Sequence, residues 1–349
     1  MAVEVMELKA TQESLWTAYV ARHPRATLFH TLAWRDAVTT AFGHENYYLL
    51  ASRNGAVSGV FPLVRVASRL AGTILVSVPY AVYGGALTDD EASRDALLRR
   101  AELIDEELGA RWLDIRSAEP LHPGLPVVDR YVTFRKPLPA EPGEVLAALP
   151  RKARAAARQA GERYGLRTEF GDEHLDTVWR LYSQSMRRLA SPNYPMAFFR
   201  GLIERTPGGE AGHVVQLVLR GDRPVAGLVS FTYRGTMMPY FAGCDERFEK
   251  YHPNNYMYLA AMQRGVELGC REFDFGRSRA DNVGSYSFKR NQGFEPIPLG
   301  YQYFVPRGGS APDLYPTSPK VRLARKIWPR LPLAVTRPLG AWLAKSIPG

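Results

Sequence analysis

The sequence is poor in the residues that build disulfide frameworks and metal sites. Two cysteines, Cys244 and Cys270, occur in 349 residues, so a disulfide framework is excluded and both are expected to be small buried side chains. The seven histidines are scattered without metal-ligand spacing, and we therefore expect no metal site. A Gly-x-Ser-x-Gly elbow and a P-loop are also missing, which excludes the hydrolases and nucleotide-binding proteins that depend on them.

Long apolar runs are scarce as well. The uncharged stretch 70–88 is interrupted by glycines and by Pro79, which indicates a strand with its turns rather than a membrane span. Residues 1–7 carry acids where a signal peptide needs a basic stretch and then an apolar one. We therefore expect a protein that stays in the cytoplasm.

The sequence contains an internal repeat. Residues 108–115 (LGARWLDI) reappear 160 residues later as 268–275 (LGCREFDF), and Pro79-Tyr80 recurs at the same offset as Pro239-Tyr240. This period is close to the length of one ordinary domain and far too long for a solenoid unit. The chain is therefore predicted to hold two copies of one domain, at 1–140 and 141–310, followed by a basic amphipathic tail at 311–349.

Hydrophobic periodicity and turn residues predict an α+β fold with a mixed sheet flanked by helices. Within each copy the expected order is two helices, three strands, a long helix and a final strand, which resembles the acetyltransferase-like (GNAT) fold. In that fold an acyl carrier lies beside the strand that precedes the long helix. The helices are expected at 15–22, 33–42, 88–108, 144–164, 175–188, 196–204 and 254–268. The strands are expected at 47–51, 57–66, 74–78, 113–116, 127–134, 166–170, 214–219, 225–233, 237–242 and 272–275.

The two copies differ where the long helix begins. In the first copy Asp89, Asp90 and Glu91 occupy the positive end of the helix dipole and would repel a phosphate. In the second copy Asn254 and Asn255 open the helix and no carboxylate lies in its first turn. Either the second helix start binds an anionic group, or the two asparagines are caps only.

The second copy also carries a segment that the first copy lacks. Arg277, after a glycine at the end of a strand, is suited to hold a carboxylate or a phosphate. Tyr286 and Lys289 are three residues apart and are predicted to share one face of a short helix, where the lysine would neutralise charge on a carbonyl oxygen. Alternatively, Arg277 and Lys289 are solvated partners of Asp274 and Asp281. Asp274 is either a general base or an anchor for Arg277 or for a backbone turn.

This segment resembles the signature of FemAB-like proteins, and more narrowly that of the subgroup associated with PEP-CTERM/exosortase systems. The resemblance covers almost the whole chain. It rests on the segments 276–278 (GRS), 284–289 (GSYSFK), 293–296 (GFEP), 29–34 (FHTLAW), 149–154 (LPRKAR), 239–243 (PYFAG) and 254–258 (NNYMY).

The resemblance implies two acetyltransferase-like domains and transfer of an acyl or aminoacyl group to an amine of a cell-envelope or exopolysaccharide-related precursor. It points to Lys289 as the catalytic lysine. Attack is expected to be direct, because no activated nucleophile is evident. The predicted catalytic residues are Lys289, Tyr286 and Asp274, and the predicted substrate-binding residues are Tyr240, Asn254, Asn255, Arg277, Ser278 and Ser285.

The resemblance leaves the donor open. No helical arm of the kind that binds aminoacyl-tRNA is evident, and the Arg/Gln-x-x-Gly-x-Gly/Ala loop of acetyl-CoA enzymes is absent ahead of the second long helix. We expect no tightly bound cofactor, with acyl-CoA or aminoacyl-tRNA as the candidate donor and a small or lipid-linked amine as the acceptor. Nucleic acid is expected only as aminoacyl-tRNA.

The net charge of +10 is concentrated in two segments. Residues 151–167 hold six Lys or Arg against one acid, and residues 320–349 hold seven and no acid. A basic tail with tryptophans is typical of peripheral contact with an anionic inner membrane. Two further interpretations stay open, a non-catalytic membrane-associated scaffold with the same fold and RNA binding through 151–167.

Overall fold

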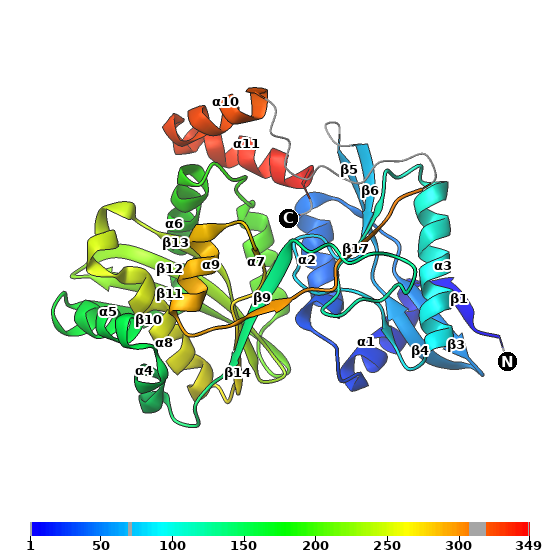
Figure 1. The fold of residues 1–349 in the computed structure, drawn as a ribbon, viewed down its shortest axis with the longest axis horizontal. Helices are drawn as coiled ribbons and strands as arrows, with labels where there is room; N and C mark the ends of the chain where they lie inside the picture. Colours follow the sequence, from blue (N-terminus) through cyan, green and yellow to red (C-terminus); the bar gives the residue numbers. More distant parts are fainter. Residues whose placement is uncertain (1, 69–71, 307–318, 348) are drawn as a thin grey trace.

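The computed structural model describes residues 2–68, 72–306, 319–347 and 349. Two α+β domains lie side by side, with the tail helices above the junction (Figure 1), and the predicted fold class is confirmed. The helices are α1 (Glu13–Arg22), α2 (Leu32–Phe42), α3 (Glu91–Glu107), α4 (Val145–Ala148), α5 (Arg151–Glu162), α6 (Leu175–Arg188), α7 (Met196–Arg205), α8 (Pro253–Glu267), α9 (Val283–Asn291), α10 (Pro319–Ile327) and α11 (Leu333–Lys345).

The strands form three sheets, two in the first domain and one in the second. Their orders are β1-β3-β4-β7, β17-β8-β6-β5-β2 and β10-β11-β12-β13-β14-β9-β15, with β16 on β9. The strands are β1 (Glu4–Glu7), β2 (Glu45–Asn46), β3 (Leu49–Arg53), β4 (Ala56–Phe61), β5 (Val64–Ser68), β6 (Gly72–Val76), β7 (Leu87–Thr88), β8 (Leu113–Ile115), β9 (Tyr131–Pro137), β10 (Leu166–Phe170), β11 (Ala211–Arg220), β12 (Arg223–Tyr233), β13 (Thr236–Cys244), β14 (Glu272–Asp274), β15 (Ser278–Arg279), β16 (Pro296–Pro298) and β17 (Gln302–Phe304).

Two expected elements are each broken by a proline. The strand expected at 57–66 is two strands, β4 and β5, that end and begin on either side of Pro62, and proline cannot donate to a ladder within a sheet. The helix expected at 144–164 is α4 and α5, because Pro150 lies between them in an extended conformation. The break after β4 separates the two sheets of the first domain.

Each domain takes one strand from the sequence range predicted for the other. β9 lies before the predicted boundary at residue 140, yet it pairs with β14 through Phe273 and Lys136. β17 lies within the range 141–310, yet it pairs with β8 through Tyr303 and Asp114. A boundary at residue 140 therefore does not separate the sheets, because sequence distance does not determine which strands pair.

Helix α6 lies very close to the second-domain sheet at two glycines. A Cβ atom on Gly243 of β13 would lie 2.2 Å from the backbone nitrogen of Tyr182, and one on Gly227 of β12 would lie 2.9 Å from a methyl group of Val178. Neither glycine has a positive φ, so close approach rather than backbone conformation requires glycine here.

Replacing Gly243 by alanine is expected to lower the free energy of unfolding by about 1–3 kcal/mol, because helix α6 must move away from β13. Gly143→Ala is the matched control, since a Cβ atom there meets nothing within 4 Å. Urea unfolding of both variants measures the effect. Equal stability of the two variants would contradict this packing.

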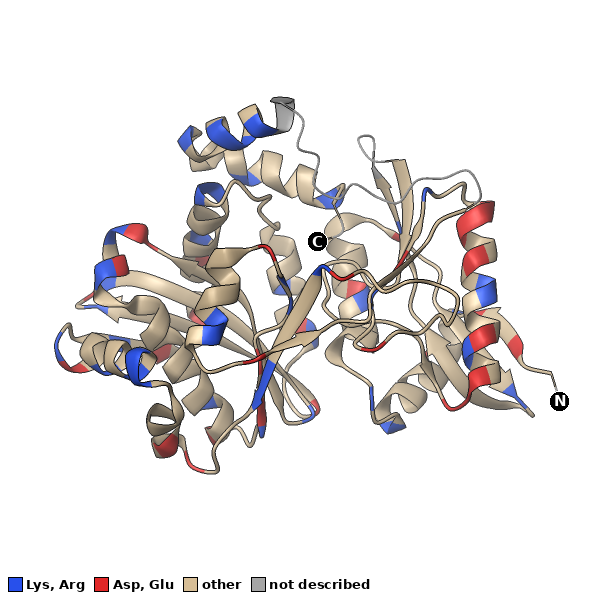
Figure 2. Cartoon of the chain, viewed as in Figure 1, with Lys and Arg blue, Asp and Glu red and all other residues tan. Residues whose placement is uncertain are grey.

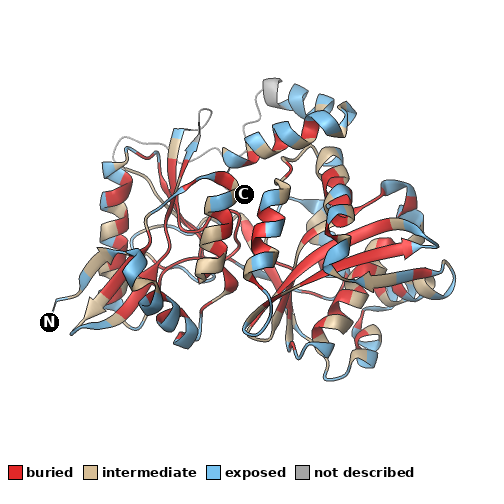
Figure 3. Ribbon diagram, turned by 180° about the vertical axis from the view of Figure 1, so that it is seen from behind, coloured by how far each residue is buried: buried red, intermediate tan, exposed pale blue. Residues whose placement is uncertain are grey.

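One apolar cluster crosses the junction between the domains. It joins Trp34 and Phe42 of α2 to Phe198 of α7 and Phe241 of β13, all at most 3% exposed. Trp34 and Phe42 each contact Phe198 edge-on, with ring centroids 5.7 Å and 5.1 Å apart. Figure 3 shows the buried strands and helix faces running through the junction from one domain to the other. The two domains therefore share part of their core.

The tail packs across the junction. The hydroxyl of Tyr80, from the first domain, donates to the carbonyl oxygen of Ala344 on α11 at 3.0 Å. Arg187 of α6 donates to the carbonyl oxygen of Leu331 at 3.4 Å, and Gly340 lies against Asn193 of the second domain. α11 continues through Pro338. Its buried face and its contacts with both domains show that the segment is part of the folded protein.

An acid without a partner lies in the first-domain core. Asp105 of α3 is 0% exposed, and neither of its carboxylate oxygens has a hydrogen-bond partner among the residues that the structure describes. Burial raises the pKa of this carboxyl group to about 7, and the charge of Glu106 adds to the shift. The folded protein therefore favours the neutral acid.

Because the folded-state pKa of Asp105 exceeds its unfolded value, the contribution to stability is fully present below about pH 4 and is lost as the pH rises through about 7. Asp105→Asn is expected to remove this loss and to stabilise the protein at pH 8 by about 2 kcal/mol. Thermal unfolding of both proteins between pH 5 and pH 8 measures it, with the exposed Glu204→Gln as control. Parallel pH profiles for wild type and Asp105→Asn would refute the interpretation.

Candidate functional site

In the second domain, the neighbouring parallel strands β13 and β14 separate after a short paired segment, and we call this place the β13–β14 opening. β13 and β14 pair only at Thr236 with Glu272 and at Met237 with Phe273, and beyond these pairs the two strands separate. A register shift in the pairing of β12 with β13 leaves Tyr240 as the extra residue of a bulge, because Val229 pairs with Phe241 and Ser230 with Pro239. Bulges commonly redirect a side chain next to a functional site. Tyr240 is therefore the bulged residue of β13, just beyond the point where β13 and β14 stop pairing.

Tyr240 connects the opening to the first domain. Its hydroxyl donates to the carbonyl oxygen of Tyr80, which is the residue 160 positions earlier in the internal repeat. Equivalent residues of the two copies thus meet at the junction. Burial raises the pKa of Tyr240 well above its usual value, and nearby Arg277 opposes this rise.

Lys289 organises the turn that follows β14. Its Nζ donates to the carbonyl oxygens of Phe275 and Gly276 at 2.9 Å and of Arg277 at 3.2 Å. The side chain is 8% exposed, and its ammonium uses all three of its donors on this turn. Gly276 at the centre of the turn has φ +65°, a conformation that favours glycine.

Burial lowers the pKa of Lys289 to about 7, the charge of Asp274 opposes the shift, and the charge of Arg277 adds to it. Lys289 is therefore a cation below about pH 7 and loses its charge as the pH rises through that value. The weakest of its three hydrogen bonds, to Arg277, is the one that a substrate oxygen would most easily replace.

Helix α9 places the remaining residues of the predicted motif. Tyr286 packs edge-on against Phe134 of β9 with ring centroids 5.4 Å apart, and Lys289 Nζ lies 5.3 Å from the centroid of the same ring. The two residues therefore share one face of a helix, as predicted. The hydroxyls of Ser278 and Ser285 are 3.0 Å apart, so these residues also lie together.

Asp274 is an anchor at the junction of the two domains. It accepts hydrogen bonds from the Tyr83 hydroxyl at 2.7 Å, the Thr133 hydroxyl at 3.2 Å and the Gly276 backbone N–H at 2.7 Å. It is 1% exposed, and burial raises its pKa while Tyr83 and Arg135 oppose the shift. Of the alternatives that the sequence left open, the structure shows the anchored backbone turn.

Arg277 is placed against two aromatic rings. Its guanidinium carbon lies 4.8 Å from the ring centroid of Tyr131 and 5.7 Å from that of Tyr301. Lys289 is not the solvated partner of an acid that the alternative interpretation expected, since it is buried and bonds to carbonyl oxygens.

The expected caps of the long second helix are wrong. α8 begins at Pro253, and its N-cap is His252 with φ +56°, so Asn254 and Asn255 lie inside the first turn. They precede Tyr258 by about one turn, and Tyr258 packs on Phe275 with ring centroids 4.8 Å apart. The first turn holds no acid, whereas the first turn of α3 holds Glu91 and is capped by Asp90. The predicted electrostatic contrast between the two helices is therefore present.

Three residues of the junction escaped the sequence analysis. Tyr83 and Thr133 bind Asp274 from 191 and 141 residues away in sequence. Asp114, the repeat equivalent of Asp274, pairs instead with Arg116 at 2.9 Å, and both side chains are 4% exposed. The internal repeat aligns Asp114 with Asp274 and was the signal that could have identified it. No local signal marked Tyr83 or Thr133.

Within the described residues the structure contains neither a cluster of metal ligands nor a helix that could span a membrane. No group of three or more His, Cys, Asp or Glu there is arranged to hold a metal ion. Nor is any helix within the described ranges both long and apolar enough to cross a bilayer. Cys244 and Cys270 are buried free thiols, as expected.

The sequence and fold match acetyltransferase domains. Residues 148–290 match the acetyltransferase (GNAT) domain family, a range that includes the β13–β14 opening and Lys289. No curated protein matches the chain significantly in sequence. The match supports an acyltransferase.

Several solved structures superimpose on most of the chain. FemX superimposes with a TM-score of 0.65 at 17% identity, covering 86% of this chain and 97% of that one. A tandem GNAT protein from the clavulanic acid biosynthesis pathway gives a TM-score of 0.55 at 12% identity, with coverage of 89% and 100%. A C-terminal domain of a putative lysylphosphatidylglycerol synthetase from Agrobacterium fabrum gives 0.54 at 13%, with coverage of 86% and 93%. These likenesses establish a tandem GNAT fold.

Proposed function

We propose that this protein is a FemAB-like acyl- or aminoacyltransferase that acylates an amine at the β13–β14 opening of its second domain. The observation that carries the proposal is the buried Lys289, whose ammonium lies on the turn after β14 where β13 and β14 separate, within the segment that matches the acetyltransferase domain. The acceptor would be an amine of a cell-envelope or exopolysaccharide-related precursor, free or lipid-linked. The PEP-CTERM/exosortase association is part of the same proposal.

The proposed chemistry is direct transfer. The acceptor nitrogen attacks the acyl carbonyl carbon, a C–N bond forms, and the bond from that carbon to the carrier's sulfur or oxygen breaks. The proton lost by the amine leaves with the carrier as its thiol or hydroxyl. Protonated Lys289 would stabilise the transient oxyanion by exchanging its bond to the Arg277 carbonyl for one to the substrate. Tyr286 would line the same face of α9.

The other predicted residues have positioning roles in this proposal. Asp274 holds the Gly276 turn and ties it to Tyr83 of the first domain. Arg277 offers a cation held between two tyrosine rings, which suits a carboxylate or phosphate of either substrate. The acid-free first turn of α8, at Asn254 and Asn255, is the proposed position for an anionic group of the donor.

A ligand panel tests the proposal. Thermal unfolding would be followed with acetyl- and longer acyl-CoAs, aminoacyl-tRNA, amino sugars and peptides, using wild type, Lys289→Ala and Arg277→Ala. A ligand at a hundred times its dissociation constant adds about 2.7 kcal/mol. We expect one donor to stabilise wild type but not the Arg277 variant. Stabilisation by no donor would contradict enzymatic transfer and favour the non-catalytic scaffold.

We also propose that the outer face of the tail rests on an anionic membrane. α10 and α11 carry Lys and Arg without acids (Figure 2). Their exposed apolar side chains lie among these cations, and basic amphipathic helices of this kind bind anionic lipid surfaces. These side chains are Leu323, Ile327, Val335, Leu339 and Trp342, each at least 40% exposed.

Replacing Leu339 and Trp342 by serine is expected to weaken binding to vesicles of phosphatidylglycerol and phosphatidylcholine about tenfold or more, because it removes apolar area from the contact. Co-sedimentation with these vesicles measures the affinity. Leu103→Ser, another exposed leucine at 51%, is the control. Unchanged binding of the double variant, or equal loss in the control, would contradict a tail-mediated contact.

A further inference from the structure

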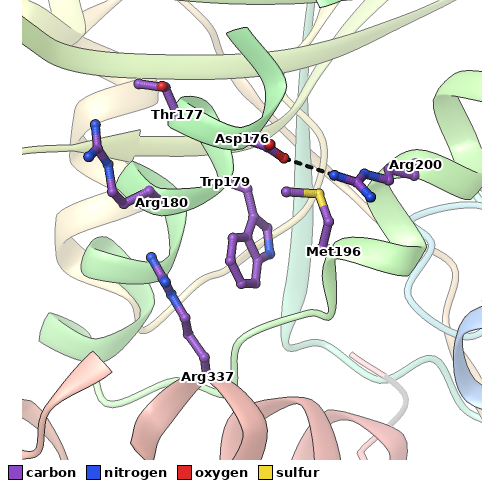
Figure 4. Close-up of a pocket in the computed structure, with 7 residues that line it drawn as sticks. All are labelled: Asp176, Thr177, Trp179, Arg180, Met196, Arg200 and Arg337. Atoms are coloured by element: carbon purple, nitrogen blue, oxygen red, sulfur yellow. Dashed lines mark hydrogen bonds and ion pairs between the residues drawn. The ribbon is translucent and has the colours of Figure 1, made fainter. Parts of the chain in front are cut away.

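A hollow of about 480 Å³ lies between α6, α7 and α11. Its volume is within the range of small-molecule sites, roughly 300–1,000 Å³. Figure 4 shows Trp179 of α6 at its centre, with Arg337 reaching toward the ring from α11 and Met196 and Arg200 on the other side. The lining residues are Asp176, Thr177, Trp179, Arg180, Met196, Arg200 and Arg337. None of them belongs to the candidate acyl-transfer site.

The charges around the hollow do not balance. Arg200 pairs with Asp176 at 3.1 Å, so these two cancel. Arg180 has no ion pair or hydrogen bond with any residue in the described part of the chain. Arg337 has no acidic partner there either, and its buried Nε lacks a hydrogen-bond acceptor. Two positive charges therefore remain uncompensated at one surface hollow.

Arg337 experiences the charge of Arg180 and is held in place by Trp179. Burial lowers the pKa of Arg337, and the charge of Arg180 lowers it further, which shows that the two guanidinium groups repel. Arg337 nevertheless stays over the ring of Trp179, 4.5 Å from its centroid. The Trp179 ring is fixed in turn, since its N–H donates to the Tyr194 carbonyl oxygen at 3.1 Å. Because Arg337 is already positioned in this way, binding an anion there costs less ordering of side chains.

We propose that this hollow binds a phosphate monoester that carries an apolar or aromatic group. A phosphate monoester has a charge near −2 at neutral pH, which matches the two uncompensated arginines, whereas a carboxylate or sulfate ester neutralises only one. Guanidinium groups bind phosphate oxygens in a bidentate manner. The apolar part of the ligand would contact Met196 and the exposed edge of Trp179. Because Arg337 belongs to α11, such a ligand would also fasten the tail to the second domain.

The test is isothermal titration calorimetry of the full chain with phenyl phosphate and with phenyl sulfate, a monoanion of nearly the same shape. At pH 7.5 we expect one phenyl phosphate per chain, bound at least about tenfold more tightly than phenyl sulfate. Arg180→Gln and Arg337→Gln should each weaken phenyl phosphate about tenfold. Arg271→Gln, an exposed arginine elsewhere in the second domain, should leave the affinity unchanged.

Two further readouts keep the result decisive. The affinity for phenyl phosphate should fall as the pH drops below about 6, where the dianion becomes a monoanion. Unfolding temperatures without ligand show whether Arg337→Gln remains folded, and the exposed Arg180→Gln carries the test if it does not. Absence of saturable binding, equal affinity for the two ligands, or full affinity in Arg180→Gln would each overturn the proposal. This outcome is independent of the acyl-donor panel, which probes Arg277 and Lys289.

Discussion

Lys289→Met is expected to lower the rate constant of acyl transfer by about 10²–10³-fold, because the site loses the cation that stabilises the oxyanion. The measurement is single-turnover transfer with the donor and acceptor that the ligand panel identifies. The contribution of Lys289 to the wild-type rate should fall as the pH rises through about 7, because the lysine loses its proton there. This fall should be absent from the variant.

The control for this prediction lies next to Lys289 on the same helix. Arg290 is exposed and pairs with Glu295, so Arg290→Met should retain the wild-type rate. Lys289→Met also leaves three carbonyl oxygens of the 275–277 turn without a donor, which should lower the free energy of unfolding by about 1–3 kcal/mol. A variant that is destabilised but fully active would show that Lys289 only supports the turn.

Asp114→Ala is expected to lower the free energy of unfolding by about 3–5 kcal/mol, because it leaves the buried guanidinium of Arg116 without its carboxylate. Denaturant unfolding measures the loss. Asp95→Ala is the control, since its ion pair with Arg94 is partly exposed and pairs of that kind contribute about 0–1 kcal/mol. A loss below that of the control would show that the pair at the junction is not buried in solution.

The sequence predicted local structure well where the pattern was regular. Strand 166–170 and helix 175–188 are present with the predicted limits, because their alternation and periodicity are strong. Pairing between distant segments was not predictable in the same way. β9 pairs with a strand of the second domain and β17 with a strand of the first, the opposite of what their positions in the sequence predicted. No sequence pattern specifies partners that lie more than a hundred residues apart.

In the candidate site, too, the local features were predictable from the sequence and the long-range contacts were not. Gly276, Lys289 and Tyr286 lie within one short segment, so their grouping around a turn and a helix face followed from spacing. The partners of Asp274 come from β9 and from the first domain, which only the folded chain brings together. The helix start at 253 also differed from prediction, because Pro253 suits the first helical position and makes the asparagine caps unnecessary.

The most direct test of the account is hydrogen exchange with and without the donor that the panel identifies. We predict slower exchange in β13 around Tyr240, at the start of α8 and in the segment 275–289, with little change at the corresponding segments of the first domain. Protection confined to the first domain, or to α6, α7 and α11 around Arg337, would contradict a transfer site at the β13–β14 opening.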